Sequence, residues 1–245
     1  MLDNPFVIVT CAYNASDYIE DCIQSCIDQN GDIGHIVIDD CSEDNTYALA
    51  KRYEDKNRLV ISTKKRSRTP ALLQRNAVKD LVKNPDALIG IVDGDDKLLP
   101  DAVATVLGEI GDNWMFCSNY IYGLGSPYTK IYIRKSKVVD FSKKVRDQKF
   151  NFHHFHGFKK RLSDRVNPKD FYKKDGSLMG AGSDIPYMYA MLEMSGPDKV
   201  KYIDKELYYY NCLNPINDHK VNLREQYDAF KLQRGIDPYV KIEML

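Results

Sequence analysis

The chain has 245 residues, of which 43% are aliphatic or aromatic and 29% are charged, a composition typical of a folded globular protein and not of a disordered one. Its 35 acidic residues balance 35 basic residues, so any attraction to nucleic acid or to an anionic membrane would have to come from a local patch. The longest apolar runs are strand-sized, well short of the roughly 20 residues that a membrane span requires.

Short β-rich segments alternate with amphipathic helical segments in the first hundred residues, which is typical of βαβ units and a largely parallel sheet. Strands are predicted at residues 5–10, 35–40, 58–63 and 87–92. Ser16 or Asp17 can cap a helix after the first strand, in which Cys22 and Cys26 would face the core. A second helix is predicted over 69–82, with Thr69 as its cap.

The second half of the chain has a less regular pattern. A helix is predicted from about residue 100, strands at 114–119 and 128–134, a helix at 184–194, strands at 199–204 and 206–211, and a polar C-terminal helix. Residues 135–183 lack periodicity and are rich in basic and aromatic residues. Long irregular segments in a compact domain are usually functional loops, and we expect that here.

Three aspartates directly follow the strand predicted at 87–92. Asp93 and Asp95 would point to the same side of an extended backbone, with Gly94 leaving room for a ligand. A divalent cation would turn their repulsion into chelation, and oxygen ligands suit Mg²⁺ or Mn²⁺ bridged to substrate phosphates. Asp96 is interpreted as a turn or helix-start residue. Asp40 follows the second predicted strand and is expected at the same edge of the sheet.

Five segments together resemble the family 2 inverting glycosyltransferases of the GT-A fold. They are VIVTCAYN (7–14), VIDDCSEDNT (37–46), ALLQRNAV (71–78), VDGDD (92–96) and GSDIPYMYAMLE (182–193). The resemblance implies an α/β GT-A fold, with a Rossmann-like, mostly parallel (mixed) central sheet flanked by helices in a single domain, 1–245. Residues 1–100 would form its nucleotide-binding half, 101–220 its acceptor-binding half and 221–245 a C-terminal helical tail.

The resemblance also implies roles for residues at the strand ends. Tyr13 and Asp40 would bind the nucleotide base, with Cys11 at a donor-binding position where the family usually has proline. Asp93 would lie near the ribose or the metal, and Asp95 would bind the metal.

Asp184 follows a glycine-containing loop at the start of a predicted helix, where a carboxylate can accept the proton of an acceptor hydroxyl. By resemblance it is the catalytic base, although Ser183 stands where the family often has glutamate. The competing interpretation of Asp184 is a helix N-cap. Glu193 lies roughly two and a half turns further on, so we expect it to form a structural pair instead of sharing this site.

Further candidates come from basic and histidine-rich segments. Arg68 ends the run KKRSR (64–68) and could reach donor phosphates, although such runs are more often solvated loops. The segment FHHFHGFKKRL (152–162) shows no zinc-ligand spacing and is interpreted as an acceptor or phosphate loop. Its candidate residues are His154, His156 and Lys159. His219 could give a third metal or phosphate contact, or could be an ordinary loop histidine.

The expected function is the metal-dependent, inverting transfer of a sugar from a nucleotide-diphosphate sugar, with a UDP-sugar favoured, to a hydroxyl of a glycan or other acceptor. The cofactor would be Mn²⁺ or Mg²⁺, and no nucleic acid partner is expected. A sugar nucleotidyltransferase is an alternative, but it would usually carry a glycine-rich basic loop after the first strand. A non-catalytic module for nucleic acid or polysaccharide is another, suggested by the basic aromatic segment 143–161.

The setting of the protein is indicated by its cysteines and its N-terminus. The six cysteines form no CxxC pair, and the first residues lack the basic and apolar regions of a signal peptide. We therefore expect a reduced, cytoplasmic location, which would be the host cytoplasm for a viral member of the family.

Overall fold

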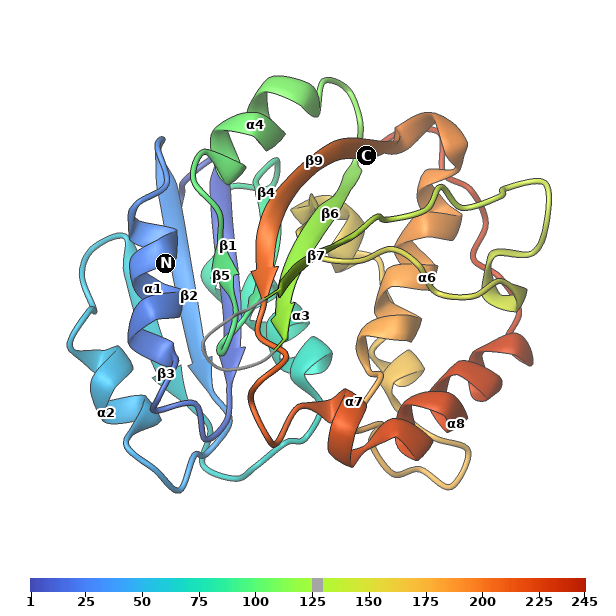
Figure 1. Ribbon diagram of the computed structural model, residues 1–245. Coiled ribbons are helices and arrows are strands. Elements are labelled where there is room, and N and C mark those ends of the chain that lie inside the picture. Colours follow the sequence, from blue (N-terminus) through green and yellow to red (C-terminus); the bar gives the residue numbers. More distant parts are fainter. Residues whose placement is uncertain (125–129) are drawn as a thin grey trace.

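A computed structural model describes residues 1–124 and 130–245 (Figure 1). Its strands are β1 (Phe6–Ala12), β2 (Ile33–Asp39), β3 (Arg58–Ser62), β4 (Leu88–Asp93), β5 (Lys97–Leu98), β6 (Met115–Leu124), β7 (Lys130–Arg134), β8 (His156–Lys159) and β9 (Val200–Tyr210). They form one mixed sheet in the order β3-β2-β1-β4-β8-β6-β9-β5, and β7 pairs with β6.

Helices flank this sheet on both faces (Figure 1). They are α1 (Ile19–Ile27), α2 (Thr46–Lys51), α3 (Pro70–Leu81), α4 (Ala102–Glu109), α5 (Lys160–Asp164), α6 (Asp184–Ser195), α7 (Asp218–Val221) and α8 (Leu223–Arg234). Short 3₁₀ turns lie at Val145–Asp147, Pro168–Phe171 and Pro197–Lys199. No helix in the two described ranges combines the length and the apolarity that crossing a membrane requires.

The parallel half of the sheet, β3-β2-β1-β4, agrees with the prediction from the sequence. All seven residues of β1 are buried, because helices cover both of its faces. Val7 and Val9 belong to the cluster that contains residues of α3 and α6, whereas Phe6 and Ile8 belong to the cluster with residues of α1 and α4. Burial on both faces explains why these strands read as nearly continuous apolar runs.

The starts of two helices differ from the predicted caps. α1 begins at Ile19, with Tyr18 and not Ser16 or Asp17 at its N-cap position, and the backbone amide of Ser16 donates to Asp44 (3.0 Å). Thr69 occupies the N-cap position of α3, but its hydroxyl donates to the carbonyl of Met179 (2.6 Å) instead of capping the helix. This bond ties the start of α3 to the segment before α6.

The second half of the sheet contains the main corrections. Part of the segment expected to be irregular forms β8, which lies antiparallel between β4 and β6. The two strands predicted within 199–211 are one strand, β9, which pairs in parallel with β6 and shifts register between Ser118 and Tyr120. The two-residue strand β5 pairs with the end of β9 and had no signal in the sequence.

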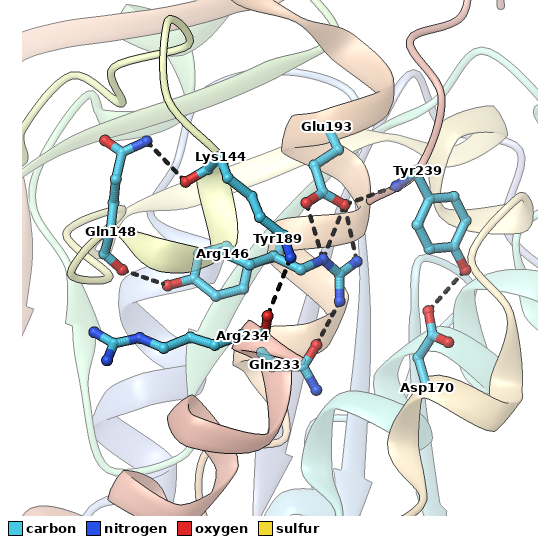
Figure 2. A network of polar contacts seen from close by, with 9 residues as sticks. All are labelled: Lys144, Arg146, Gln148, Asp170, Tyr189, Glu193, Gln233, Arg234 and Tyr239. Atoms are coloured by element: carbon cyan, nitrogen blue, oxygen red, sulfur yellow. Dashed lines mark hydrogen bonds and ion pairs between the residues drawn. The ribbon is translucent and has the colours of Figure 1, made fainter. Parts of the chain in front are cut away.

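A buried ion pair joins α6 to the 3₁₀ turn Val145–Asp147, and hydrogen bonds extend the network to the C-terminal segment (Figure 2). Arg146 is fully buried, and its guanidinium donates to both oxygens of Glu193 at 2.9–3.0 Å. It also donates to Oε1 of Gln233 in α8 (2.6 Å), and the backbone amide of Tyr239 donates to Glu193 (3.0 Å). The predicted structural pairing of Glu193 is confirmed, and it fixes α6 and α8 relative to each other.

Candidate active site

A cleft of about 670 Å³ lies beyond the carboxyl ends of β1, β2 and β4, the usual ligand site of an open α/β sheet. The predicted site residues that line it are Cys11, Tyr13, Asp40, Arg68, Asp93, Asp95, His154, His156 and Asp184. The opposite wall comes from the segment after β9, from α7 and from α8, which contribute Asn214, Asp218 and Glu225 among others. Segments far apart in the sequence therefore converge on one cavity.

Two predicted residues do not join this group in the described structure. Lys159 is the last residue of β8 and pairs with Leu88, the first residue of β4, so it lies at the opposite end of the sheet. Its placement in an acceptor or phosphate loop is wrong, because the segment continues as a strand that leads away from the cleft. The side chain of His219 lies outside the described part of the chain.

At one end of the cleft, Asp40 fixes the basic loop 64–68. Its carboxylate accepts hydrogen bonds from the backbone amides of Ser67 (2.6 Å) and Arg68 (2.9 Å). The loop conformation that results places the guanidinium of Arg66 3.3 Å from the ring centroid of Tyr13. Arg66 thus contacts the ring that was expected to bind the base, whereas the sequence had singled out only Arg68 of this loop, as a contact to the donor phosphates.

Cys11 lies between the two acidic strand ends. Burial and the charges of Asp93 and Asp40 raise the pKa of its thiol well above the usual value. The thiol donates weakly to the carbonyl of Pro70 (3.6 Å). Cys11 is therefore a neutral wall of the cleft at neutral pH.

Asp93 and Asp95 both face the cleft, as predicted from their spacing. Burial and the charge of Asp218 raise the pKa of Asp93 to about 6. Burial and the charge of Asp93 raise the pKa of Asp95 to about 6, against the opposing effect of the Asn214 amide, which donates to Asp95 at 2.7 Å. Burial is the larger cause for both carboxylates, and the negative charge of a neighbouring aspartate adds to it.

Gly94 has a different role from the one expected. A Cβ at this position would lie 2.6 Å from Cβ of Ala12 and 3.0 Å from its Cα. The residue must therefore be glycine so that the turn can pack against β1, and not to give a ligand room. The backbone amide of Gly94 donates to the carbonyl of Cys11 (3.0 Å), which fixes the turn that presents both carboxylates.

Asp96 is directed away from the pair. It is only 1% exposed and accepts hydrogen bonds from the hydroxyl of Tyr208 and the backbone amide of Asn211, both at 2.7 Å. Its own amide closes a turn onto Asp93 (3.0 Å), so the turn interpretation is confirmed. It does not start a helix, because α4 begins at Ala102. Asp96 instead anchors the end of β9 beside the cleft.

His154 lies at the centre of the carboxylate group. Its Nε2 is 3.5 Å from Oδ2 of Asp93, and its ring stacks between those of His156 (4.7 Å between centroids) and Tyr208 (4.8 Å). Burial lowers the pKa of His154 to about 4, although the charges of Asp184 and Asp95 act in the opposite direction. The imidazole is therefore neutral at neutral pH and can orient the carboxylates without adding charge.

Asp184 is the first residue of α6, and Ser183 holds the N-cap position, so the N-cap interpretation of Asp184 is wrong. Burial raises the pKa of Asp184 to about 6, partly offset by His154. Gly182 before it has φ +82°, and a Cβ there would lie 3.1 Å from Ala229 of α8. The loop that presents Asp184 is thus packed closely on α8.

Sequence reasoning missed Asn214, Asp218 and Tyr208. Asn214 orients Asp95, Asp218 raises the pKa of Asp93, and the Tyr208 hydroxyl donates to Asp96 while accepting from the backbone amide of Asp93 (3.1 Å). Only the closely spaced Asn and Asp residues of NPIND hinted at a polar loop. Each of these contacts spans more than 100 residues, which local patterns cannot reveal.

The side chains at the cleft fit a hard divalent cation, because Asp93 and Asp95 offer only oxygen atoms as metal ligands. Among the described side chains, no group of three His, Cys, Asp or Glu could hold a metal by itself. A cation here would need ligands beyond the protein, such as the phosphate oxygens of a substrate.

Comparison with known proteins identifies the family of the chain. The family model for Glycosyl transferase family 2 matches residues 7–168. TuaG of Bacillus subtilis (strain 168), named as a teichuronic acid biosynthesis glycosyltransferase, is 33% identical over 95 residues, which are 38% of this chain and 37% of TuaG. The chain thus matches little more than a third of this relative.

Solved structures share the fold at low sequence identity. S. aureus TarS 1–349 in complex with UDP-GlcNAc superposes with a TM-score of 0.63 and 18% identity, over 93% of this chain and 65% of that one. Glucosyl-3-phosphoglycerate synthase from Mycobacterium tuberculosis was solved in complex with Mn²⁺, UDP and glucosyl-3-phosphoglycerate. It superposes with a TM-score of 0.58 and 15% identity, over 96% of this chain and 81% of the synthase chain. The predicted single-domain GT-A fold is confirmed by these matches.

Proposed function

Because the chain belongs to glycosyl transferase family 2, we propose that it transfers a sugar from a nucleotide-diphosphate sugar to an acceptor hydroxyl with inversion at the anomeric carbon. The observation that carries this proposal is the convergence of Asp93, Asp95 and Asp184 in one cleft that also contains Tyr13 and Asp40. These are the groups that donor binding, cation binding and proton removal require.

The nucleotide would lie at the end of the cleft formed by Tyr13 and the 64–68 loop. The aromatic face of Tyr13 suits a base, and the guanidinium groups of Arg66 and Arg68 suit phosphates. A UDP-sugar is the favoured donor, because TarS and the synthase above were solved with UDP-GlcNAc and UDP respectively. The nucleotide half of the site then lies in residues 1–100 and the acceptor half in 101–220, while α8 in the tail adds Glu225 to the cleft wall.

Asp93 and Asp95 would hold Mn²⁺ or Mg²⁺ together with the donor diphosphate. The cation would neutralise the negative charge that develops on the leaving diphosphate. Asn214 would keep the Asp95 carboxylate oriented through its 2.7 Å hydrogen bond. Mn²⁺ is present in the structures of the M. tuberculosis synthase and of the mannosyltransferase PcManGT from Pyrobaculum calidifontis, which supports a divalent cation here as well.

Asp184 would act as the general base. A carboxylate with a pKa of about 6 is mostly ionised at neutral pH and still basic enough to accept the proton of a hydroxyl as that hydroxyl attacks the anomeric carbon. A single displacement of this kind needs no nucleophilic side chain. The raised pKa of the Cys11 thiol agrees with this, since a neutral thiol is a poor nucleophile.

A thermal-shift panel tests the proposal. The protein is heated with UDP-GlcNAc, UDP-glucose, GDP-mannose, dTDP-glucose or CDP-glucose, each with Mn²⁺ and with EDTA. A donor at 100 times its Kd stabilises the fold by about 2.7 kcal/mol, or roughly 5–10 °C for a chain of this size. We expect such a shift for at least one donor, with Mn²⁺ only. The absence of a shift with every donor would contradict the proposal.

A further inference from the structure

A row of four tyrosines leads out of the cleft along β6 and β7. Tyr210, at the end of β9, lines the cleft, and its ring centroid lies 5.7 Å from that of Tyr120. Tyr120 is 6.1 Å from Tyr122, and Tyr122 is 5.4 Å from Tyr132 with ring planes inclined by only 21°. We refer to these four residues as the tyrosine row.

Strand geometry places the row on one face of the sheet. Tyr120 and Tyr122 are two residues apart on β6, so they share a face, and Tyr132 is the direct partner of Tyr122 on β7. Tyr210 is the direct partner of Tyr122 on β9. In Figure 1 β7 runs alongside β6, which lies next to β9, the strand that ends with the cleft residue Tyr210.

The exposure of these rings argues against simple core packing. Tyrosines that serve the core of this protein are almost completely buried, as Tyr187 (1%) and Tyr189 (2%) show. Tyr132, in contrast, is 39% exposed, and the other members of the row are half-buried. Each ring in the row is therefore supported by its neighbour and still accessible from solvent.

A positive charge accompanies the row. Arg134 is the strand partner of Tyr120, shares a face of β7 with Tyr132, and is exposed. It forms no ion pair with any acidic side chain in the described ranges. Its charge also helps to lower the pKa of His153, whose ring packs edge-on against Tyr120 (5.7 Å). The guanidinium is thus free to bind an anionic group on a ligand that covers the tyrosines.

We propose that the tyrosine row and Arg134 bind the acceptor, and that the acceptor is an oligosaccharide chain carrying anionic sugars. Tyrosine combines an apolar ring with a hydroxyl, which matches the apolar faces and hydroxyl groups of sugars. The row starts at the cleft that contains Asp184, so a chain lying on it would bring its terminal sugar to the candidate base. This inference rests on the proposed function and adds the class of acceptor to it.

Single-stranded nucleic acid is the main competitor, because bases also stack on aromatic side chains beside basic residues. The position of the row favours the saccharide, since it begins at Tyr210 in the cleft that also contains Asp184, the candidate base for a sugar acceptor. A binding experiment with both ligand classes separates them.

The test measures binding of three fluorescent probes by thermophoresis: a hyaluronan hexasaccharide, which carries carboxylates, neutral chitohexaose and the oligonucleotide dT15. The variants are Tyr132→Leu, Tyr132→Phe and Arg134→Gln. Tyr47→Leu is the matched control, because Tyr47 on α2 is 37% exposed, much like Tyr132, and does not line the cleft. UDP binding with Mn²⁺ is measured on every variant.

We expect the hyaluronan hexasaccharide to bind the wild type more tightly than dT15. Tyr132→Leu should weaken this binding about 2- to 10-fold, the range for loss of one aromatic contact. Tyr132→Phe keeps the ring and should weaken it less than Tyr132→Leu, and Tyr47→Leu should leave it unchanged. Arg134→Gln should remove the preference for hyaluronan over chitohexaose. UDP binding should be the same throughout.

Three results would overturn the inference: no binding of either hexasaccharide, equal binding by the wild type and Tyr132→Leu, or a preference for dT15. If UDP still binds the wild type in these cases, the proposed function stands and only the acceptor assignment fails. Loss of UDP binding in the wild type would instead refute the donor site.

Discussion

The substitution Glu193→Gln should destabilise the protein strongly, although Glu193 lies far along α6 from the candidate base. The side chains of Arg146 and Glu193 are 0% and 4% exposed, and three N–O contacts of 2.9–3.0 Å join them. Glutamine would keep one side-chain oxygen as an acceptor, but the guanidinium would stay buried without a negative charge beside it in this network (Figure 2). Removing one member of a buried ion pair typically costs about 3–5 kcal/mol.

That cost is a large part of the roughly 5–15 kcal/mol by which domains are stable. For a chain of this length it corresponds to a fall in Tm of about 6–20 °C, which differential scanning calorimetry can measure. Asp198→Asn is the matched control, because Asp198 pairs with Lys241 on the surface with both side chains largely exposed. Such surface pairs contribute about 0–1 kcal/mol, so the control should change little.

The double variant Arg146→Met with Glu193→Leu should recover much of the loss, because apolar residues of similar volume often replace a buried ion pair without net cost. A loss below about 1 kcal/mol in Glu193→Gln would show that the Arg146–Glu193 network does not hold α6 and α8 together.

Three further predictions test other parts of the structure. Gly94→Ala should lower the free energy of unfolding by about 1–3 kcal/mol, because its Cβ would clash with Ala12. Gly108→Ala in α4 is the control and should be neutral or stabilising, because nothing lies within 4 Å of the added Cβ. Urea titration measures both variants. Asp96→Ala should lower Tm without weakening Mn²⁺-dependent UDP binding, since Asp96 anchors β9 and is not expected to bind the cation. UDP binding as weak as in Asp95→Ala would refute this structural role of Asp96. His35 is buried with its pKa lowered to about 3, so the unfolded chain binds the proton first and stability falls as the pH drops from about 6.5 towards 3. Between pH 7 and pH 5 the free energy of unfolding of the wild type should fall by about 2 kcal/mol more than that of His35→Gln. An equal pH dependence of the unfolding free energy in the two proteins would contradict this.

The parallel half of the fold could be predicted because its signals are local. Apolar runs mark β1, β2 and β4, and acidic residues mark the points where these strands meet the cleft. Asp93 and Asp95 face the cleft because turn and strand geometry act over only a few residues. The same local logic identified Cys22 and Cys26 as core residues, and both are buried and free.

The remainder depends on contacts that no local pattern reveals. β8 has only four residues, one of them glycine, and it is a strand because β4 and β6 pair with it on both sides. Arg146 lies in a segment that reads as solvated and basic, yet it is fully buried because Glu193 lies opposite it. Asp218 lines the cleft from the segment that follows β9, and Asp96 holds the start of that segment through the backbone amide of Asn211.

The most direct test of the donor site is isothermal titration of UDP into the wild type and into Asp95→Asn, each with Mn²⁺ and with EDTA. If Asp95 holds a cation that bridges to the diphosphate, the wild type should bind UDP at least tenfold more tightly with Mn²⁺ than with EDTA, a difference of about 1.4 kcal/mol or more. Asp95→Asn should lose that difference while keeping the Tm of the free protein. Equal Mn²⁺ dependence in both proteins, or tight binding of UDP to the wild type in EDTA, would contradict a metal-dependent donor site at Asp95.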